Sequence, residues 1–257
     1  MAYKIRVLLV LTTLLLVGYG ILEAIEVDGN KEDISSIGYE IIEAKYINAD
    51  IIIHYPQIIN LGDKGKQNEI NRILKEEALA VLDEYEESEI SSKLSLDMDF
   101  DVMWDGQRLL SIRYLGDGYL KGAAHPFNFF YTTNINIMNG TKVRLKELIE
   151  IDDGLVYKLK QAKYRPWHSA LNLAEDGILN EVLSDWFNDY NLIDYISKRD
   201  NSDEYLDFWY LTEDTLGISL GIPHAIGDHM EFEIDYKDLR SNIKAENELW
   251  KDFSINL

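Results

Sequence analysis

Three runs of alternating apolar and polar residues constrain the fold of this 257-residue chain more than any other feature. In the first run acids fill most polar positions: Leu94, Leu96, Met98, Phe100 and Val102 alternate with Ser95, Asp97, Asp99 and Asp101. The second run comprises Phe129, Tyr131, Thr133, Ile135 and Ile137, and the third places Glu231, Glu233 and Asp235 between Met230, Phe232, Ile234 and Tyr236. Because successive side chains of a strand point to opposite faces, each run predicts a strand with one apolar face and one solvated polar face.

Two short turn signals predict that neighbouring strands run antiparallel. Asp105-Gly106 follows the first run and precedes a further apolar strand around Ile112, and Asn139-Gly140 follows the second run. Asp-Gly and Asn-Gly favour the type I′ turn, in which both central residues have positive φ. Each pair therefore predicts a β-hairpin.

The remaining segments alternate between strand and helix signals in blocks. Residues 41–55 are rich in Ile and Tyr and predict a strand or strand pair that stops at Pro56, because proline cannot donate to a ladder. The clearest helix is predicted from Asn68 onward by apolar residues at helical spacing: Ile70, Ile73, Leu74, Ala78, Val81, Leu82 and Tyr85. A second helical stripe follows Asp152: Ile178, Leu179, Val182, Leu183, Trp186 and Phe187. Strands return over residues 205–211, 216–220 and 230–236, so we predict an α+β fold with mainly antiparallel sheets packed with helices.

The N-terminal residues predict export. Lys4 and Arg6 precede an uncharged, apolar run over residues 7–22, which is typical of a signal peptide or of a membrane anchor. Residues 23–38 are polar and charged and read as a tether. Residues 39–257 then form a single extracytoplasmic domain, in which two lobes of about residues 39–120 and 121–257 remain an option. We expect the protein to be membrane-anchored or secreted.

The charge balance narrows the class of partner. The chain has 25 basic and 46 acidic residues, a formal net charge of −21, and no cysteine. Such a charge repels a phosphate backbone, so nucleic acid is not an expected partner, whereas cationic proteins are attracted. Without cysteine the chain has no disulfide and no thiol nucleophile.

No metal or catalytic motif emerges from the residue pattern. The acids of the first run and Asp105 have part of the spacing of a calcium loop, but Val102 and Arg108 stand where an EF-hand needs Gly and Glu. His224 and His229 have the spacing of half a zinc site, without a second ligand pair. The chain also contains no G-x-S-x-G motif. We expect no catalytic residue, no metal and no cofactor, and hence not an enzyme.

One loop resembles a known family. Its residues are Lys121, Gly122, Ala123, Ala124, His125 and Pro126, followed by an aromatic strand, Asn134, Asn139-Gly140 and Leu145 to Leu148. This stretch resembles the GGAHP-containing extracytoplasmic domain of unknown function that occurs in lysozyme-sensing anti-sigma factors of Gram-positive bacteria and ahead of the catalytic domain of some peptidoglycan deacetylases. The similarity extends over about residues 40–240, with Ala123 in place of the second glycine and His224 in place of a tyrosine. The resemblance implies a binding domain alone, displayed outside the membrane.

Two groups of residues are candidates for binding. The first is the loop itself, with Gly122, Ala124, His125 and Pro126, for which a purely structural role is the alternative. The second is the pair of acidic strand faces: Asp97, Asp99 and Asp101, and Glu231, Glu233 and Asp235. The expected function is binding of a cationic protein such as lysozyme at the cell envelope. The alternative is a cell-wall glycan-binding or envelope-structural module that uses Trp104, Trp167 or Trp209 as a stacking platform.

Overall fold

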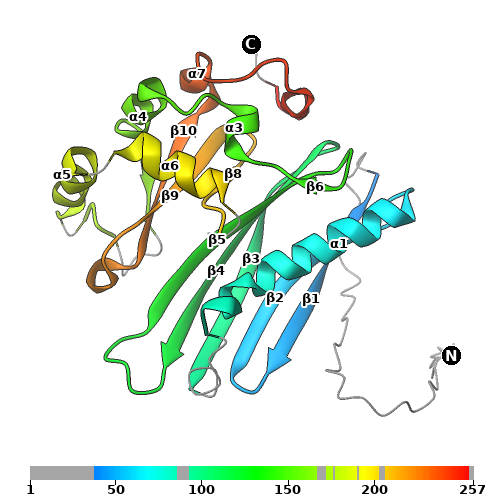
Figure 1. Ribbon diagram of the computed structural model, residues 1–257, viewed down its shortest axis with the longest axis horizontal. Helices are drawn as coiled ribbons and strands as arrows, with labels where there is room; N and C mark the ends of the chain where they lie inside the picture. The colour runs from blue at the N-terminus through cyan, green and yellow to red at the C-terminus, as the bar shows by residue number, and fades with distance from the viewer. Residues whose placement is uncertain are drawn as a thin grey trace, which may run out of the picture.

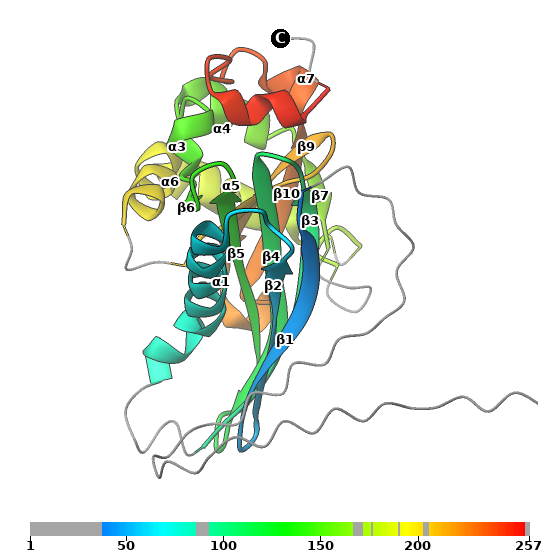
Figure 2. The same ribbon diagram turned by 90° about the vertical axis from the view of Figure 1, so that its right-hand side faces the viewer.

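The chain folds into two β-sheets and their covering helices (Figures 1 and 2), and the predicted α+β class is confirmed. The computed structural model describes residues 38–85, 93–166, 172–175, 177–189, 191–202 and 206–254. The first sheet has its strands in sequence order: β1 (Glu40–Asn48), β2 (Ile51–Ile59), β3 (Leu94–Asp105), β4 (Leu109–Leu120), β5 (Phe127–Asn136) and β6 (Thr141–Lys142). The second sheet has the order β7 (Lys163–Arg165), β10 (His229–Asp235), β9 (Thr215–Gly221) and β8 (Trp209–Leu211). Both are antiparallel except for the short parallel pair β2–β3.

Most of the helices are short and pack on the outer surfaces of the two sheets. They are α1 (Lys64–Leu79), α3 (Leu145–Leu148), α4 (Asp153–Leu159), α5 (Leu179–Asp189), α6 (Leu192–Asn201) and α7 (Tyr236–Leu239), with 3-10 segments η1 (Ala80–Tyr85), η2 (His224–Ile226) and η3 (Glu248–Asp252). None of the helices in the described ranges is long and apolar enough to cross a membrane. The predicted signal or anchor over residues 1–22 and nearly all of the predicted tether lie outside the described residues.

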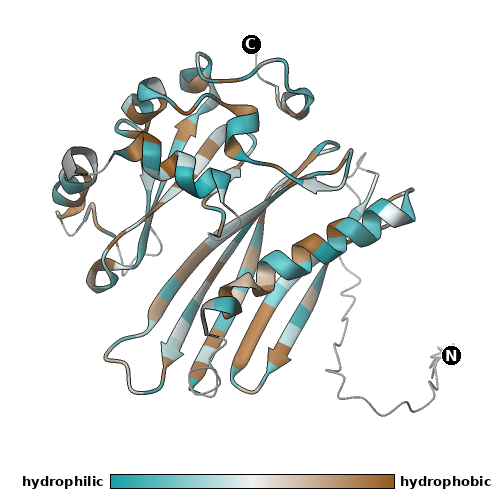
Figure 3. Ribbon diagram, in the orientation of Figure 1, coloured by the Kyte–Doolittle hydropathy of each residue, from teal (hydrophilic) through white to brown (hydrophobic). Residues whose placement is uncertain are grey.

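Helix α1 covers one face of the first sheet. Its apolar residues Ile70, Ile73, Leu74 and Ala78 are buried, as their spacing predicted, and Asp63 caps its first turn by accepting from the backbone N–H of Lys66. The helix begins four residues before Asn68 because this cap precedes the apolar stripe. Figure 3 shows apolar residues along the strands behind α1, while α1 itself alternates between polar and apolar positions. Burial of this face supplies the core of the first sheet.

The strand predicted to stop at Pro56 continues through it. β2 runs to Ile59, and Pro56 lies opposite Glu43 of β1. Asn71 of α1 bonds both the backbone N–H and the carbonyl of Ile58, so these groups point away from β1. By the period of two, the nitrogen of Pro56 also points away from β1, and β2 pairs with β3 only over residues 51–53. No ladder bond is lost at Pro56, which is why the strand tolerates a proline.

The hairpin predicted at Asp105-Gly106 forms, but its turn lies two residues later. The backbone N–H of Gly106 donates to the carbonyl of Leu109, which places Gln107 and Arg108 in the turn, and Gly106 does not have the positive φ of a type I′ turn. Glycine is required for a different reason. A Cβ at Gly106 would lie 2.0 Å from Oδ2 of Asp252 in the C-terminal segment. The Asn139-Gly140 hairpin is confirmed, with positive φ at Gly140 alone in a four-residue turn.

The second sheet is joined to the first by buried polar side chains. Ser111 of β4 donates to Asn134 of β5, and Asn134 donates to the carbonyl of Trp209 in β8 at 2.8 Å. Ser111 also accepts from the backbone N–H of Leu211. The optional lobe boundary near residue 120 falls inside the β4–β5 hairpin, since β5 pairs with β4 over ten residues. Most residues of the first hydrophobic core precede Val143 and most residues of the second follow from it, although Leu109 belongs to the second core and Leu206 packs against the first.

The Asp252 contact predicts a large effect of one substitution. Asp252 accepts from the backbone N–H groups of Arg108 and Leu109 at 2.7 and 2.9 Å, and only 3% of its side chain is exposed. Asp252→Ala leaves both donors without their partner and should lower the free energy of unfolding by about 3 kcal/mol in urea titrations. Asp252→Asn keeps one acceptor oxygen and should lose less. Equal losses in the two variants would contradict this account.

A buried carboxyl between α1 and the second sheet predicts a pH dependence. Burial raises the pKa of Asp207 from 3.8 to about 6; Lys142 opposes the rise and Glu77 adds to it. The folded protein thus holds this proton more tightly than the unfolded chain, and the contribution of Asp207 to stability falls as the pH rises from about 4 to about 6. Relative to Asp207→Asn, which cannot titrate, the wild type should lose on the order of 3 kcal/mol over this range. Urea titrations of both proteins along the pH range test this, and parallel profiles would refute it.

Candidate functional site

The acids of the first run lie on an exposed face of the first sheet, opposite α1. Asp97, Asp99 and Asp101 of β3 are exposed, whereas Leu94, Leu96 and Met98 between and before them are buried. The predicted alternation is therefore confirmed here. Asp117 of β4 lies directly opposite Asp97 and is also exposed. These four aspartates, Asp97, Asp99, Asp101 and Asp117, form what we call the acidic face.

The acidic face carries an unfavourable electrostatic interaction. Directly opposed like charges in an antiparallel pair are destabilising, and Asp97 and Asp117 are such a pair. Arg113 offsets the charge only at one end of the face, where its guanidinium lies 2.7 Å from Asp101. The sheet would therefore be more stable with a neutral residue at Asp97 or Asp117.

The expectation of a second exposed acidic face in β10 is wrong. Glu231 and Glu233 are 3% and 8% exposed, and only Asp235 at the end of the strand remains partly exposed. The second sheet turns this polar side toward the first sheet, where Glu231 binds Arg113 at 2.9 Å. Arg165 lies 3.1 Å from Glu233. The alternation correctly placed the three acids on one side of β10, but it could not show that another sheet covers that side.

Ion pairing compensates the burial of these two carboxylates. The hydroxyl of Tyr210 donates within 3.2 Å of both Glu231 and Glu233, and the guanidinium of Arg113 lies 5.6 Å from the centre of the Tyr210 ring. Burial alone would lower the pKa of Arg113, but Glu231 and Asp101 reverse the direction and the pKa is raised. Burial, with Glu231 and Glu233, raises the pKa of Tyr210. Arg113 thus stays charged and Tyr210 neutral, as the two buried carboxylates require.

The loop that resembles the family motif connects β4 to β5. Gly122 has φ +101°, and the N–H of Ala123 donates to the carbonyl of Leu120, which together describe a turn with glycine at its third position. A Cβ at Gly122 would meet nothing within 4 Å, so the backbone conformation and not the space requires glycine. Ala124, His125 and Pro126 are exposed at the tip.

A second loop, between β9 and β10, meets the β4–β5 loop. The ring of His224 lies 4.9 Å from that of Phe127 and 6.3 Å from that of His125, and Nδ1 of His224 lies 2.8 Å from Asp228. Asp228 has a positive φ of 70° and accepts from the backbone N–H of Asn128. Sequence spacing gave no sign of this contact, because about a hundred residues separate the two loops.

The two loops border the acidic face. In the strand register Asn128 lies directly opposite Asp117, which lies opposite Asp97, so Asp228 continues the row of carboxylates beyond β5. His224 and His229 do not face each other. His229 of the second sheet instead lies between Phe130 of the first sheet and Glu231 of its own strand. Within the described residues no group of three or more His, Cys, Asp or Glu side chains has the geometry of a metal site.

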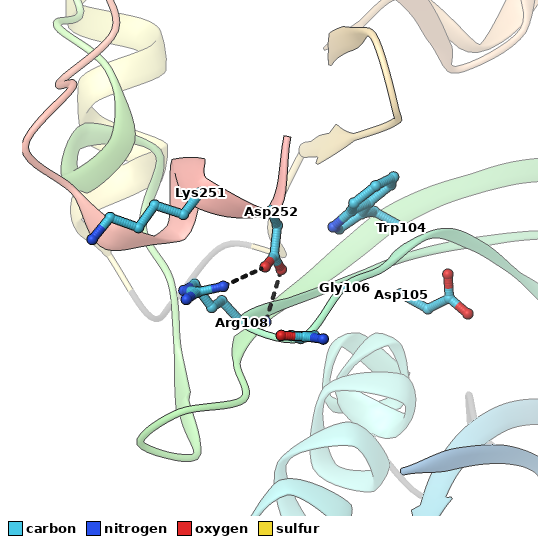
Figure 4. A pocket seen from close by; sticks show the side chains of 7 residues that line it. Trp104, Asp105, Gly106, Arg108, Lys251 and Asp252 are labelled. Carbon is cyan, nitrogen blue, oxygen red and sulfur yellow. Dashed lines mark hydrogen bonds and ion pairs between the residues drawn. The ribbon is translucent and has the colours of Figure 1, made fainter. Parts of the chain in front are cut away.

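A shallow hollow lies at the turn of the β3–β4 hairpin, at the end of these strands opposite the β4–β5 loop. It has a volume of about 450 Å³ and is lined by Trp104, Asp105, Gly106, Gln107, Arg108, Lys251 and Asp252. Figure 4 shows Asp252 between Arg108 and Trp104, with Lys251 pointing away. Of the three tryptophans considered for glycan stacking, Trp209 is fully buried and cannot serve, and Trp167 lies outside the described residues. Trp104 lines the hollow and stacks on Phe253 at 4.7 Å.

Comparisons with known proteins give one family match. The family described as Deacetylase PdaC matches residues 42–128, from β1 to the start of β5. A DUF3298 family member from Bacteroides fragilis is 13% identical over 84% of this chain and 97% of its own, with a TM-score of 0.45. A DUF3298 family protein from Pseudomonas aeruginosa is 12% identical over 82% of this chain and 96% of its own, with a TM-score of 0.43. No curated protein matches the sequence.

The family match covers the N-terminal part of the region that resembles the GGAHP-containing domain. It ends at residue 128, immediately after the β4–β5 loop. It is compatible with an extracytoplasmic domain of unknown function. The match spans about a third of the chain, and the structural similarities are too distant for a functional argument.

Substitution of Arg113 measures how much the buried ion-pair cluster that joins the two sheets contributes to the free energy of unfolding. Arg113→Ala leaves Glu231 buried without its cation and should destabilise the fold by about 3–5 kcal/mol. Adding Glu231→Gln should recover part of this loss, because an amide carries no charge. Arg72, which pairs with Glu69 and Glu76 on the exposed side of α1, is the matched control, and its replacement by Ala should cost far less, because solvent screens an exposed ion pair. Chemical denaturation of the four proteins measures these values, and similar losses for the two arginines would contradict the prediction.

Proposed function

We propose that the chain is a binding domain displayed outside the cytoplasmic membrane, and that the acidic face recognises a cationic protein. The observation that carries the proposal is the exposed row of carboxylates on β3 and β4, retained although Asp97 and Asp117 repel each other. A cationic surface would relieve this repulsion on binding. The net charge of −21 supports the same class of partner.

The borders of the acidic face support its use as a binding surface. The β4–β5 loop and the β9–β10 loop border it at one end, with exposed His125 and His224, and the second sheet covers β4 and β5 at the other end. The carboxylates between these borders stay open to solvent and can be reached by a cationic partner. Lysozyme is the cationic protein that the resemblance to lysozyme-sensing domains favours as a first probe.

The location and the absence of an enzymatic role are part of the same proposal. Lys4, Arg6 and the apolar run over residues 7–22 support export. The matched family is named after a deacetylase, but the match reaches only residues 42–128. We therefore propose binding as the role of this chain, with the acidic face as the interacting surface.

A second candidate is glycan binding at the hollow beside Trp104. An indole flanked by Arg108, Gln107 and Asp252 combines an apolar ring with several hydrogen-bonding groups, which suits a sugar. Phe253 covers part of the Trp104 ring, so the platform is smaller than that of an exposed tryptophan.

The binding proposal predicts a charge-dependent association rate. Asp97→Asn/Asp99→Asn/Asp117→Asn should lower the rate of lysozyme association by about tenfold and leave dissociation nearly unchanged, because long-range steering acts on the encounter. Raising the salt from 0.1 M to 1 M shortens the Debye length from about 10 Å to about 3 Å and should mimic the substitutions. Asp101 is kept because it pairs with Arg113. Surface plasmon resonance on the immobilised chain measures both rates.

The control neutralises three acids that lie away from the acidic face. Glu213, Asp214 and Asp238 are exposed on the β8–β9 turn and α7, at the opposite end of the molecule from the β4–β5 loop (Figure 1). Their replacement by Gln, Asn and Asn removes the same charge and should change the rate much less. If both triple variants slowed association equally, the net charge of the chain, and not the acidic face in particular, would determine the association rate. Binding of peptidoglycan fragments alone, abolished by Trp104→Ala, would favour the glycan candidate.

A further inference from the structure

Apolar side chains share the face of the first sheet that carries the exposed acids. Paired residues of neighbouring strands point to the same side of a sheet, so the strand register places each of these side chains. Ile52 of β2 lies beside Asp97 of β3, and Ile47 of β1 lies opposite Ile52. The acidic face therefore has apolar neighbours on the side of β1 and β2.

Two further apolar residues come from β4 and lie on either side of Asp117. Leu115 and Tyr119 precede and follow Asp117 by two positions, so alternation places all three on one side of the strand. Leu115 also lies opposite Asp99 of β3. The opposed carboxylates of β3 and β4 are thus bordered by apolar groups on the side of β2 and in both directions along β4. We call these four residues the apolar border: Ile47, Ile52, Leu115 and Tyr119.

The apolar border is not part of the folded interior. Ile47 is 56% exposed and Tyr119 is 43% exposed, whereas Ile52 and Leu115 are partly exposed. Neither hydrophobic core of the described chain includes any of the four, either as a buried member or as a partly buried neighbour. Folding leaves their apolar surface in contact with water, and a bound partner can remove it.

The four side chains are close enough together for one partner to cover them. Neighbouring strands lie about 4.8 Å apart and a strand rises about 3.3 Å per residue, so Ile47 is roughly 14 Å from β4 and Leu115 is roughly 13 Å from Tyr119. A typical interface buries about 800 Å² on each partner, which corresponds to a patch nearly 30 Å across. The apolar border and the carboxylates between its members fit within one such interface.

We propose that the apolar border makes the short-range contacts that hold the bound cationic protein, while the carboxylates that it surrounds attract this protein. The inference rests on the proposed function and specifies the partner further: its contact surface carries an apolar side chain next to lysine or arginine. Apolar contacts that exclude water at the centre of an interface act mainly on dissociation. Charge acts mainly on association. The two kinds of residue on this face thus have separable effects.

Threonine substitutions test the apolar border. Threonine removes apolar surface but keeps a shape that strands favour, and it changes no charge. Ile47→Thr/Leu115→Thr should raise the dissociation rate of lysozyme about tenfold and change its association rate less than twofold. Tyr119 is kept because its hydroxyl donates to the carbonyl of Ala123 in the β4–β5 loop. Surface plasmon resonance on the immobilised full chain, purified in mild detergent, measures both rates, and circular dichroism verifies that the variant is folded.

The matched control replaces two exposed apolar residues elsewhere. Met138 in the turn between β5 and β6 is 59% exposed, and Tyr157 of α4 is 63% exposed. Met138→Thr/Tyr157→Thr should leave both rates of lysozyme binding unchanged. Similar dissociation rates for the two double variants would overturn the inference.

Polylysine separates the inference from the proposed function, because it offers positive charge without an apolar or aromatic side chain beside that charge. The dissociation of polylysine should be the same from the wild type and from Ile47→Thr/Leu115→Thr. If lysozyme also left both proteins at the same rate, the inference would be wrong and the proposed function would stand. Binding of polylysine without binding of lysozyme would likewise exclude the apolar contact. If the wild type bound neither probe at low salt, the proposed function would fall, and the inference with it.

Discussion

The packing of the second sheet against the polar side of the first is the constraint on which the rest of the structure depends. Arg113 lies at the boundary: one side of its guanidinium binds the exposed Asp101 and the other binds the buried Glu231. Buried carboxylates are tolerated only when charge and hydrogen bonds compensate them, and Arg113, Arg165 and Tyr210 supply this compensation. The position of the second sheet also decides which acids face solvent. The polar side of β3 stays exposed, whereas the polar side of β10 is covered by the first sheet.

This arrangement explains why the acidic face and the two loops adjoin. Beyond Phe130 the second sheet covers β5, so the uncovered face is bounded on that side by the β9–β10 loop. Asp228 fixes the loop to the backbone of Asn128, and Asn128 lies in line with Asp117. A surface assembled from three separate parts of the chain is thereby held by hydrogen bonds and ring contacts rather than by one motif.

The sequence by itself determined the strands, the main helix and the α+β class, because periods of two and of about 3.6 follow from backbone geometry within each segment. It identified the exposed acids of β3 and the glycine-containing loop at Gly122. Only the tertiary structure decided that Glu231 is buried, that Gly106 makes room for Asp252, and that His125 lies beside His224. Alternation states which side of a strand is polar, but solvent or a second sheet can satisfy that side equally well. The choice between them depends on contacts between residues about a hundred or more positions apart, which no local pattern records.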